Sequence, residues 1–409
     1  MKKTYFLIMI FMILMGVKPF LLEAKPSGFA FRYPVKSVRI PVEIQNNIVL
    51  VPLRINNSFE MNFILDTGVR TTILTETVVA SFLGLDTLTT VKVRGLGEGG
   101  AIDAGLATNV SITMPGIVGT GQRLIVLPEG VISYSGLFGK PVYGIIGYEV
   151  FRQFVVEINY TQKFIRLHDP FKFKPKKKSV SLPISIQKSK PYVEATLIDY
   201  HGEKIKSDWL IDTGASQAIS LFTEDLSAPE KSIDAFLGMG LSGGVYGKLG
   251  RVQAFSLGEF TFEDVITGFP DTASLNILAE SNVWYGNLGA EIISRFHVVF
   301  DYPRASIYLR KNSNFRKDFR YNISGIELLT SGEDFDKYVV SYVRPDSPAE
   351  EADVQINDEI LSINGIDVEK LNIDELYGTL GYKNRKVITL RLKRDGEAFR
   401  VRFRLISEI

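Results

Sequence analysis

The chain has 409 residues, and its 47 basic and 46 acidic residues almost cancel. This length predicts more than one hydrophobic core, whereas the balanced charge gives no reason to expect nucleic acid as a partner. Cysteine is absent and the three histidines are scattered, which excludes thiol chemistry and disulfides and argues against a zinc site. Carboxylates are therefore the groups left for acid–base chemistry, and we expect no metal and no cofactor.

Residues 1–24 have the pattern of an export signal. Lys2 and Lys3 precede an almost uninterrupted apolar run from Tyr5 to Val17, and Ala24 offers a small residue for cleavage. The run of about 13 residues is shorter than a helix needs to span a bilayer. We expect an exported protein, periplasmic or secreted, with no integral membrane span after signal removal. An uncleaved N-terminal membrane anchor is the alternative.

Residues 35–312 contain an internal duplication, because four segments recur in the same order about 142 to 146 residues later. The matched pairs are Ser37–Gln45 with Ser179–Gln187, Phe63–Gly68 with Trp209–Gly214, Ile145–Gly147 with Asn287–Gly289, and Phe154–Tyr160 with Phe296–Tyr302. Alternating apolar stretches, such as 38–44 and 48–55, predict β-strands in each copy. We therefore expect two β-rich lobes, over 35–171 and 179–312, joined by a solvated basic linker over 172–178.

A different pattern begins at about Tyr321. It predicts strands over 338–343, 359–363, 387–393 and 399–405, with helices near 348–352 and 373–380. A segment of this size is one small domain. The chain is thus predicted to be mainly β, with two tandem lobes followed by a small α+β domain over 321–409.

Each lobe carries an Asp-Thr-Gly triplet after an apolar strand-like run. The triplets are Asp66-Thr67-Gly68 and Asp212-Thr213-Gly214. Two adjacent carboxyl groups cannot both ionise readily and so share one proton; the ionised group can accept a proton from water while the other donates one. Threonine can tie one loop to the other, and glycine allows close backbone approach. The competing interpretation, two turns capped by aspartate, leaves the matched flanks and register unexplained.

This pattern resembles the pepsin and retropepsin class of aspartic peptidases, specifically bacterial retropepsin-like proteins that carry a PDZ domain. The likeness covers both lobes and includes the apolar-apolar-Gly element late in each, Ile145–Gly147 and Asn287–Gly289, where Asn287 departs from the apolar pattern. It implies two closed β-barrel-like lobes related by a pseudo-twofold axis, with the catalytic dyad at their interface. It also implies a monomer containing both halves of the dyad, and a peptide bound in the cleft as an added strand.

Two positions beside the dyad refine what the resemblance implies. Pepsin-like enzymes commonly have a hydroxyl residue after one triplet, and its hydrogen bond lowers the dyad pKa. Val69 and Ala215 stand at those positions here, which predicts a pH optimum less acidic than that of pepsin-like enzymes. Arg70 occupies a position that is often small, polar or acidic in the family, and we expect it to pair with a surface acid rather than act on the dyad or select acidic substrates.

Two glycine-rich segments, 95–100 and 240–244, lie roughly 25–30 residues after the triplets, in equivalent places of the repeat. The first formally matches a GxGxxG motif, but no βαβ unit surrounds it. The second formally matches a GxSxG nucleophile elbow, but Ser242 lacks a base, because His297 aligns with Val155 in a strand-like position and is expected to pack. The resemblance instead implies two flaps that close over bound peptide. The flap candidates are Gly97, Gly99, Gly100, Gly240, Gly243 and Gly244. Ordinary glycine-rich hairpins are the alternative.

The segment Ser347–Gly365 resembles the PDZ pattern in which a short helix leads to a Gly-Asp-x-Ile-x-x-Ile-Asn-Gly run, with Asn357 where glycine is usual. The resemblance makes Ser324, Gly325 and Ile326 the loop whose backbone amides bind the carboxylate of a peptide C-terminus. A purely structural or tethering role is the alternative to this capture.

The sequence thus predicts an aspartic endopeptidase that hydrolyses exported proteins or peptides with a water activated between Asp66 and Asp212. Its expected partners are a polypeptide substrate and a C-terminal peptide ligand of the PDZ domain. The alternative is a catalytically idle peptide-binding or scaffold protein built from the same lobes and PDZ domain. Two intact triplets favour the enzyme, since a binding protein needs neither aspartate.

Overall fold

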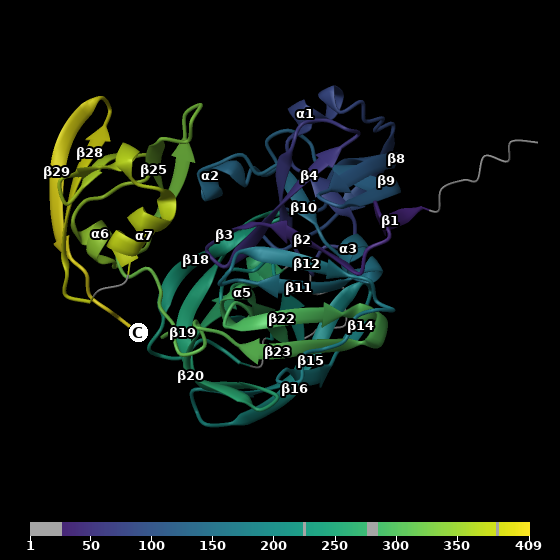
Figure 1. The fold of residues 1–409 in the computed structure, drawn as a ribbon. Helices are drawn as coiled ribbons and strands as arrows, with labels where there is room; N and C mark the ends of the chain where they lie inside the picture. Colours follow the sequence, from purple (N-terminus) through teal and green to yellow (C-terminus); the bar gives the residue numbers. More distant parts are fainter. Residues whose placement is uncertain (1–26, 224–225, 276–284, 382–383) are drawn as a thin grey trace, which may run out of the picture.

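The computed structural model describes residues 27–223, 226–275, 285–381 and 384–409. The expected export signal at 1–24 lies outside them and stays a prediction. Figure 1 shows a body of β-strands made by the first three quarters of the chain, with a smaller domain packed against one side. No helix within the described ranges is long and apolar enough to cross a membrane.

The first lobe is built on a nine-stranded sheet. Its strands are β1 (Gly28–Phe31), β3 (Glu43–Gln45), β4 (Ile48–Ile55), β5 (Met61–Leu65), β6 (Thr72–Leu74), β7 (Thr89–Val93), β8 (Ile102–Met114), β9 (Ile117–Val126) and β10 (Gly144–Ile146). The sheet closes into a barrel in the order β4-β5-β10-β6-β9-β8, because β8 pairs with both β9 and β4. Helices α1 (Thr77–Phe82), α2 (Ser135–Phe138) and α3 (Tyr148–Gln153) complete the lobe.

The second lobe repeats this plan with an eight-stranded sheet. Its strands are β14 (Ser185–Gln187), β15 (Lys190–Ile198), β16 (Lys204–Asp212), β17 (Ile219–Leu221), β18 (Ile233–Gly240), β19 (Gly243–Leu257), β20 (Phe260–Pro270) and β21 (Gly286–Gly289). Pairing of β15 with β19 closes the barrel β15-β16-β21-β17-β20-β19. Its helices are α4 (Thr272–Leu275) and α5 (Ala290–Ile293). The predicted mainly-β fold with two barrel lobes is confirmed.

A third sheet, which we call the central sheet, joins the lobes and was not predicted. Its six strands are β2 (Ser37–Pro41), β11 (Val155–Asn159), β12 (Phe164–His168), β13 (Val180–Pro183), β22 (Phe296–Asp301) and β23 (Ser306–Lys311), with the 3-10 turn η2 (Tyr302–Arg304) between the last two. The order is β13-β23-β22-β11-β12-β2, so the lobes meet where β11 and β22 pair antiparallel. Val298 and Phe300 are fully buried in the core. The alternate positions form the opposite face, which is polar around Glu157 and His297 and carries a small apolar cluster of Val155, Val299 and Tyr308.

The C-terminal domain is a separate six-stranded sheet with two α-helices. Its elements are β24 (Ile326–Ser331), β25 (Lys337–Val343), α6 (Pro348–Glu351), β26 (Glu359–Ile363), β27 (Ile366–Asp367), η3 (Val368–Lys370), α7 (Ile373–Gly381), β28 (Val387–Arg394) and β29 (Glu397–Arg404). The strands and helices predicted here are present to within about two residues, the usual uncertainty of such boundaries. Ser347 caps α6 by accepting a hydrogen bond from the N–H of Glu350 at 3.3 Å.

This domain contacts both lobes. The Thr330 hydroxyl on β24 donates to the Gly136 carbonyl in α2 at 2.9 Å. On the other lobe, the ring of Tyr342 lies 6.3 Å from that of Phe236 and 6.0 Å from that of Tyr246. Phe236 and Tyr246 belong to the strands of the β18–β19 hairpin, so the domain contacts the hairpin whose turn is one of the two segments expected to be flaps.

Candidate active site

The two triplets follow equivalent strands in the two barrels. Asp66 follows β5, which pairs in parallel with β10, and Asp212 ends β16, which pairs in parallel with β21. The backbone N–H of Asp66 donates to the Ile146 carbonyl at 2.9 Å. The apolar-apolar-Gly elements therefore lie directly beside the aspartate strands, which explains why both recur in register in the two halves of the sequence.

The threonines tie the two loops together. The hydroxyl of Thr67 accepts a hydrogen bond from the N–H of Thr213, and the hydroxyl of Thr213 accepts one from the N–H of Thr67, both at 3.1 Å. Each hydroxyl also donates across the interface, to the carbonyls of Ile211 at 2.6 Å and Leu65 at 2.8 Å. Both threonines are fully buried, so this reciprocal network fixes the spacing of the aspartates.

The side chains of Asp66 and Asp212 line one cavity at the junction of the lobes, close enough that each carboxyl group shifts the pKa of the other. Asp66 Oδ1 accepts from the N–H of Gly68 at 2.6 Å. Asp212 accepts more donors: the N–H groups of Gly214 at 3.0 Å and Ala215 at 3.1 Å reach its Oδ1. The side-chain amide of Asn287 donates to its Oδ2 at 2.6 Å. Because hydrogen-bond donors stabilise the charged form, the ionised carboxylate of the pair belongs on Asp212.

The pKa values follow from the same surroundings. Burial raises the pKa of both carboxyl groups, and the charge of Asp212 raises that of Asp66 further, to about 8. The ammonium group of Lys190 opposes this and lowers the pKa of both. Such a pair holds one proton through the neutral range, which is the state that general acid–base hydrolysis requires.

Glycine is required in the triplets for steric reasons. A Cβ on Gly214 would lie 2.5 Å from the carboxyl carbon of Asp66, closer than any side chain can approach. A Cβ on Gly147 would lie 1.9 Å from the backbone oxygen of Asp66. The close approach of the two loops therefore depends on the absence of side chains at these points.

Comparison with known families agrees with this geometry. Residues 51–150 match the family model described as aspartyl protease, and residues 339–394 match the one described as PDZ domain. The chain carries a retropepsin-like aspartyl protease domain followed by a PDZ domain. The resemblance stated from the sequence is thus confirmed at the level of the family. A search of curated proteins found no match.

A cavity of about 500 Å³ is lined by Asp66 and Asp212 of the aspartyl protease domain. It is lined by both lobes and by both glycine-rich segments. Its walls include Ile64, Val69, Arg94, Gly95, Leu96, Tyr134, Lys188, Lys190, Tyr192, Met239, Gly240, Leu241 and Asn287, besides Asp66 and Asp212. The mixture of apolar walls with a few convergent polar groups is typical of a ligand cleft.

The two segments expected to be flaps meet above this cleft. One is the loop between β7 and β8, and the other is the turn of the β18–β19 hairpin. The N–H of Gly99 donates to the Ser242 carbonyl at 2.7 Å, and the N–H of Ser242 donates to the Leu96 carbonyl at 3.0 Å. Gly97 and Glu98 also contact the opposite lobe, through Ser274 and Gly244.

Of the six flap candidates, Gly240 lines the cavity. Gly97, Gly99, Gly243 and Gly244 belong to the contact between the two segments. Gly100 accepts a hydrogen bond from the Ser242 hydroxyl at 3.1 Å. Leu96, Met239 and Leu241, which are next to these glycines in the sequence, also line the cavity, and sequence reasoning did not single them out.

The flanking positions differ in their surroundings. Val69 is buried, and Ala215 contributes only its backbone N–H to the dyad. Arg70 is exposed. The expected pairing of Arg70 with a surface acid is not seen, since it makes no ion pair with any residue that the structure describes. The cation that lowers the pKa of both aspartates is Lys190, which sequence reasoning did not single out.

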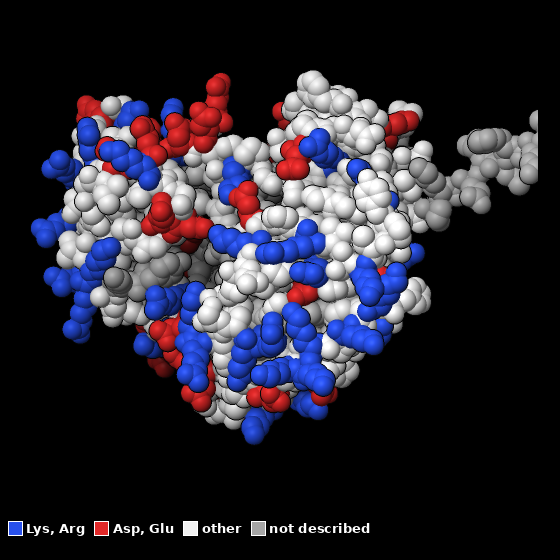
Figure 2. All heavy atoms as spheres, in the orientation of Figure 1, with Lys and Arg blue, Asp and Glu red and all other residues white. Residues whose placement is uncertain are grey.

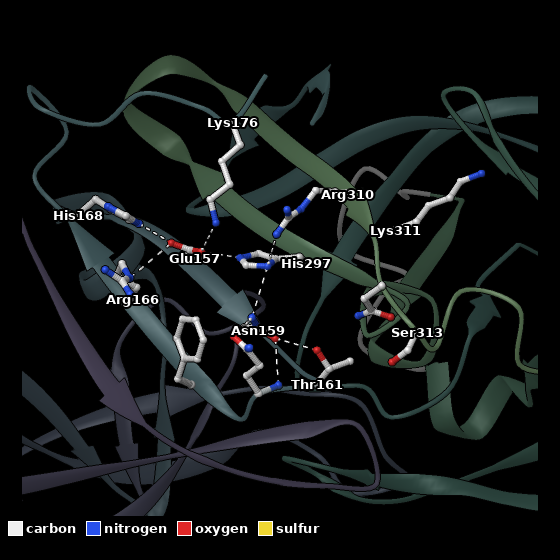
Figure 3. Close-up of a pocket in the computed structure, with 13 residues that line it drawn as sticks. Glu157, Asn159, Thr161, Arg166, His168, Lys176, His297, Arg310, Lys311 and Ser313 are labelled. Carbon is white, nitrogen blue, oxygen red and sulfur yellow. Dashed lines mark hydrogen bonds and ion pairs between the residues drawn. The ribbon is translucent and has the colours of Figure 1, made fainter. Parts of the chain in front are cut away.

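Neither the GxGxxG match at 95–100 nor the GxSxG match at 240–244 forms a site of its own. The Ser242 hydroxyl accepts from the N–H of Gly95 at 3.2 Å and donates to the Gly100 carbonyl, so it braces the two segments. His297 is not simply a packing residue, because its Nε2 hydrogen-bonds Glu157 at 2.5 Å in a polar cluster on the central sheet (Figure 3).

The candidate carboxylate-binding loop of the PDZ domain is closed on itself. Ser324 and Ile326 are fully buried. The N–H of Ser324 donates to the Asn322 side chain at 3.1 Å, and the N–H of Ile326 donates to the Ser324 hydroxyl at 3.2 Å. A Cβ on Gly325 would collide with the Ser347 side chain at 2.3 Å. The two amides would have to exchange these partners to bind a ligand carboxylate.

Proposed function

We propose that the chain is an aspartic endopeptidase that hydrolyses peptide bonds with a water activated between Asp66 and Asp212. The proposal rests on one observation, the reciprocal Thr67–Thr213 network that brings the two buried triplets together, so that both aspartates line one cavity at the junction of the lobes. The aspartyl protease match over 51–150 includes the first of them, and the duplication supplies the second.

In this mechanism Asp212 is the base and Asp66 the acid. The ionised Asp212 takes a proton from water as the water oxygen bonds to the peptide carbonyl carbon, and Asp66 gives its proton to the carbonyl oxygen. The resulting diol collapses when the C–N bond breaks and a proton passes to the leaving nitrogen. The number of donors on Asp212, three against one on Asp66, supports this division of roles.

The substrate we propose is an extended polypeptide of exported proteins, held along the cleft as an added strand. Its entry requires the hydrogen bonds between the 95–100 and 240–244 segments to open, which gives those segments the role of flaps. One chain contributes both aspartates, and we propose a monomer that acts outside the cytoplasm. The N-terminal signal pattern supports that location.

The decisive experiment compares the parent protein with Asp66→Asn and Asp212→Asn on a peptide library. Cleavage should fall by at least about a thousandfold in each variant, since the pair acts as a unit, while thermal melting stays cooperative. Cleavage that survives either change refutes the dyad. Absence of cleavage by the parent protein, with peptide binding retained, favours the scaffold function instead.

A further inference from the structure

A second cavity, of about 640 Å³, lies on the polar face of the central sheet. Figure 3 shows side chains from β11, β12, β22 and β23 converging on it, with Lys176 reaching in from the linker between the lobes. We call it the cationic pocket. It is lined by Glu157, Asn159, Thr161, Gln162, Phe164, Arg166, His168, Lys176, His297, Arg310, Lys311, Asn312 and Ser313. It shares no residue with the cleft over the dyad.

The charge of this pocket is unbalanced. Arginine or lysine contributes four of its lining side chains, and Glu157 is the one carboxylate among them. Glu157 is only 4% exposed. Its two oxygens accept from His297 at 2.5 Å and His168 at 2.7 Å, and Lys176 adds a contact at 3.3 Å. Because both of its oxygens are buried and already accept from these side chains, the Glu157 carboxylate is shielded from a ligand in the pocket.

The neighbours of Glu157 favour its ionised form. Burial by itself would raise its pKa, but hydrogen bonds from His168 and His297, together with nearby charge, hold the pKa well below its usual range. The Arg310 guanidinium, which can only donate, hydrogen-bonds to His297 Nδ1 at 3.0 Å. His297 thus orients Arg310 without cancelling its charge.

Two of the cations lack a carboxylate partner. Among the described residues, neither Arg310 nor Lys311 is within ion-pair distance of an acid. By contrast, Arg304, which precedes β23, forms an ion pair with Asp301 at 2.7 Å. The Lys311 ammonium lies over the Phe315 ring, 4.2 Å from its centroid, whereas Arg310 points toward His297 (Figure 3). A guanidinium in a concave site is a group that proteins use to bind phosphoryl oxygens.

The rim of the pocket adds a second, independent feature. The linker beside it exposes Lys172, Lys174, Lys177 and Lys178, and Phe171, next to them, is 96% exposed. Phe173 anchors this segment by packing its ring 5.0 Å from that of His168. In Figure 2, lysine and arginine side chains gather on the face that carries β22 and β23 in Figure 1, although the whole chain is nearly neutral.

We infer that this face docks on an anionic membrane surface, with the phosphoryl group of a lipid headgroup in the cationic pocket and the Phe171 ring at the interface. Clustered lysines bind anionic lipid surfaces, and aromatic rings favour the headgroup level. Exposing an aromatic ring to water does not stabilise the protein, whereas contact with lipid would bury the apolar surface of the ring.

The test is cosedimentation of the full chain with phosphatidylcholine vesicles that contain or lack phosphatidylglycerol. Binding should require the anionic lipid and weaken as salt is added. Lys176→Gln combined with Arg310→Gln should weaken it by about fivefold per cation, or roughly 25-fold. Arg400→Gln combined with Arg402→Gln removes the same charge from exposed positions of β29 in the PDZ domain and should leave binding unchanged.

Further arms identify the source of the phosphoryl group. Phe171→Ala should weaken vesicle binding but leave competition by soluble glycerol phosphate intact. If Arg310→Gln lowers the melting temperature, Lys176→Gln with Lys311→Gln replaces it, since both lysines are exposed. Equal binding to neutral vesicles, or equal loss in the β29 control, overturns the inference. So does binding of inorganic phosphate in the pocket without any binding to vesicles. None of these outcomes bears on peptide cleavage, which is measured separately.

Discussion

Asn287 offers the sharpest test of how the dyad divides its roles. It stands where the first lobe has Ile145, and its amide donates to Asp212 Oδ2 at 2.6 Å. A hydrogen bond to a charged group contributes about 1.5–3 kcal/mol, which corresponds to roughly 1–2 pKa units. Asn287→Leu should therefore make Asp212 harder to ionise by that amount, while keeping a side chain of similar size in the wall.

The two limbs of the pH profile should respond differently. On the acid side, the doubly protonated pair loses a proton from Asp212, so this limb of kcat/KM should move up by about 1–2 pH units. On the alkaline side the proton leaves Asp66, whose pKa burial and Asp212 raise to about 8. Asp212 is ionised both before and after that step, so the alkaline limb should hardly move.

The assay is a full pH–rate profile on one fluorogenic peptide, with Ile145→Leu as the matched control in the other lobe. The control should leave both limbs in place. If Asn287→Leu leaves the acid limb fixed, or moves both limbs together, the assignment of Asp212 as the ionised partner is wrong. A lower rate at every pH with no shift would instead mean that Asn287 only shapes the wall.

Three further changes test the supporting structure. Thr67→Val removes a hydroxyl that serves two buried backbone groups, and should lower the free energy of unfolding by roughly 2–4 kcal/mol in urea titrations; a loss under about 0.5 kcal/mol would contradict the role of the network. Gly214→Ala should abolish cleavage because its Cβ would meet the Asp66 carboxyl group, whereas Gly378→Ala in α7, with nothing within 4 Å, should be tolerated. Glu157→Gln should cost stability near neutral pH, and the difference from the parent should shrink as pH falls below about 4.5, because a lowered pKa stabilises only while the group is ionised. A difference that is constant with pH in melting curves would refute this.

The dyad could be predicted from the sequence because the duplication places a second triplet in register with the first. A single Asp-Thr-Gly is common, but two in register within matched flanks leave few other interpretations. The PDZ strands could also be predicted from the sequence, because the alternation of apolar and polar residues in a strand is a local pattern. The central sheet was not, because β11 and β22 pair although they lie more than a hundred residues apart, with Ile158 opposite Val298. Neither strand shows in isolation which neighbour it will have.

The same reason explains the residues that were misjudged or missed. His297 was expected to pack, because its repeat partner is Val155, but its neighbour across the lobe junction is Asn159 and its ring meets Glu157. Asn287 was noted only as a departure from an apolar pattern, and its contact with Asp212 depends on the parallel pairing of β16 with β21. A contact between two elements does not show in the residue periodicity of either element, so the sequence pattern could not predict it.

The fusion of the two halves into one chain has a consequence for how they can change. In an assembly of two identical subunits, the position facing each aspartate would have to hold the same residue twice. Here Ile145 and Asn287 occupy the paired positions, and one half has gained an amide donor while the other keeps a hydrocarbon wall. Covalent linkage thus permits a division of labour between the carboxyl groups that a strictly symmetric dimer could not encode.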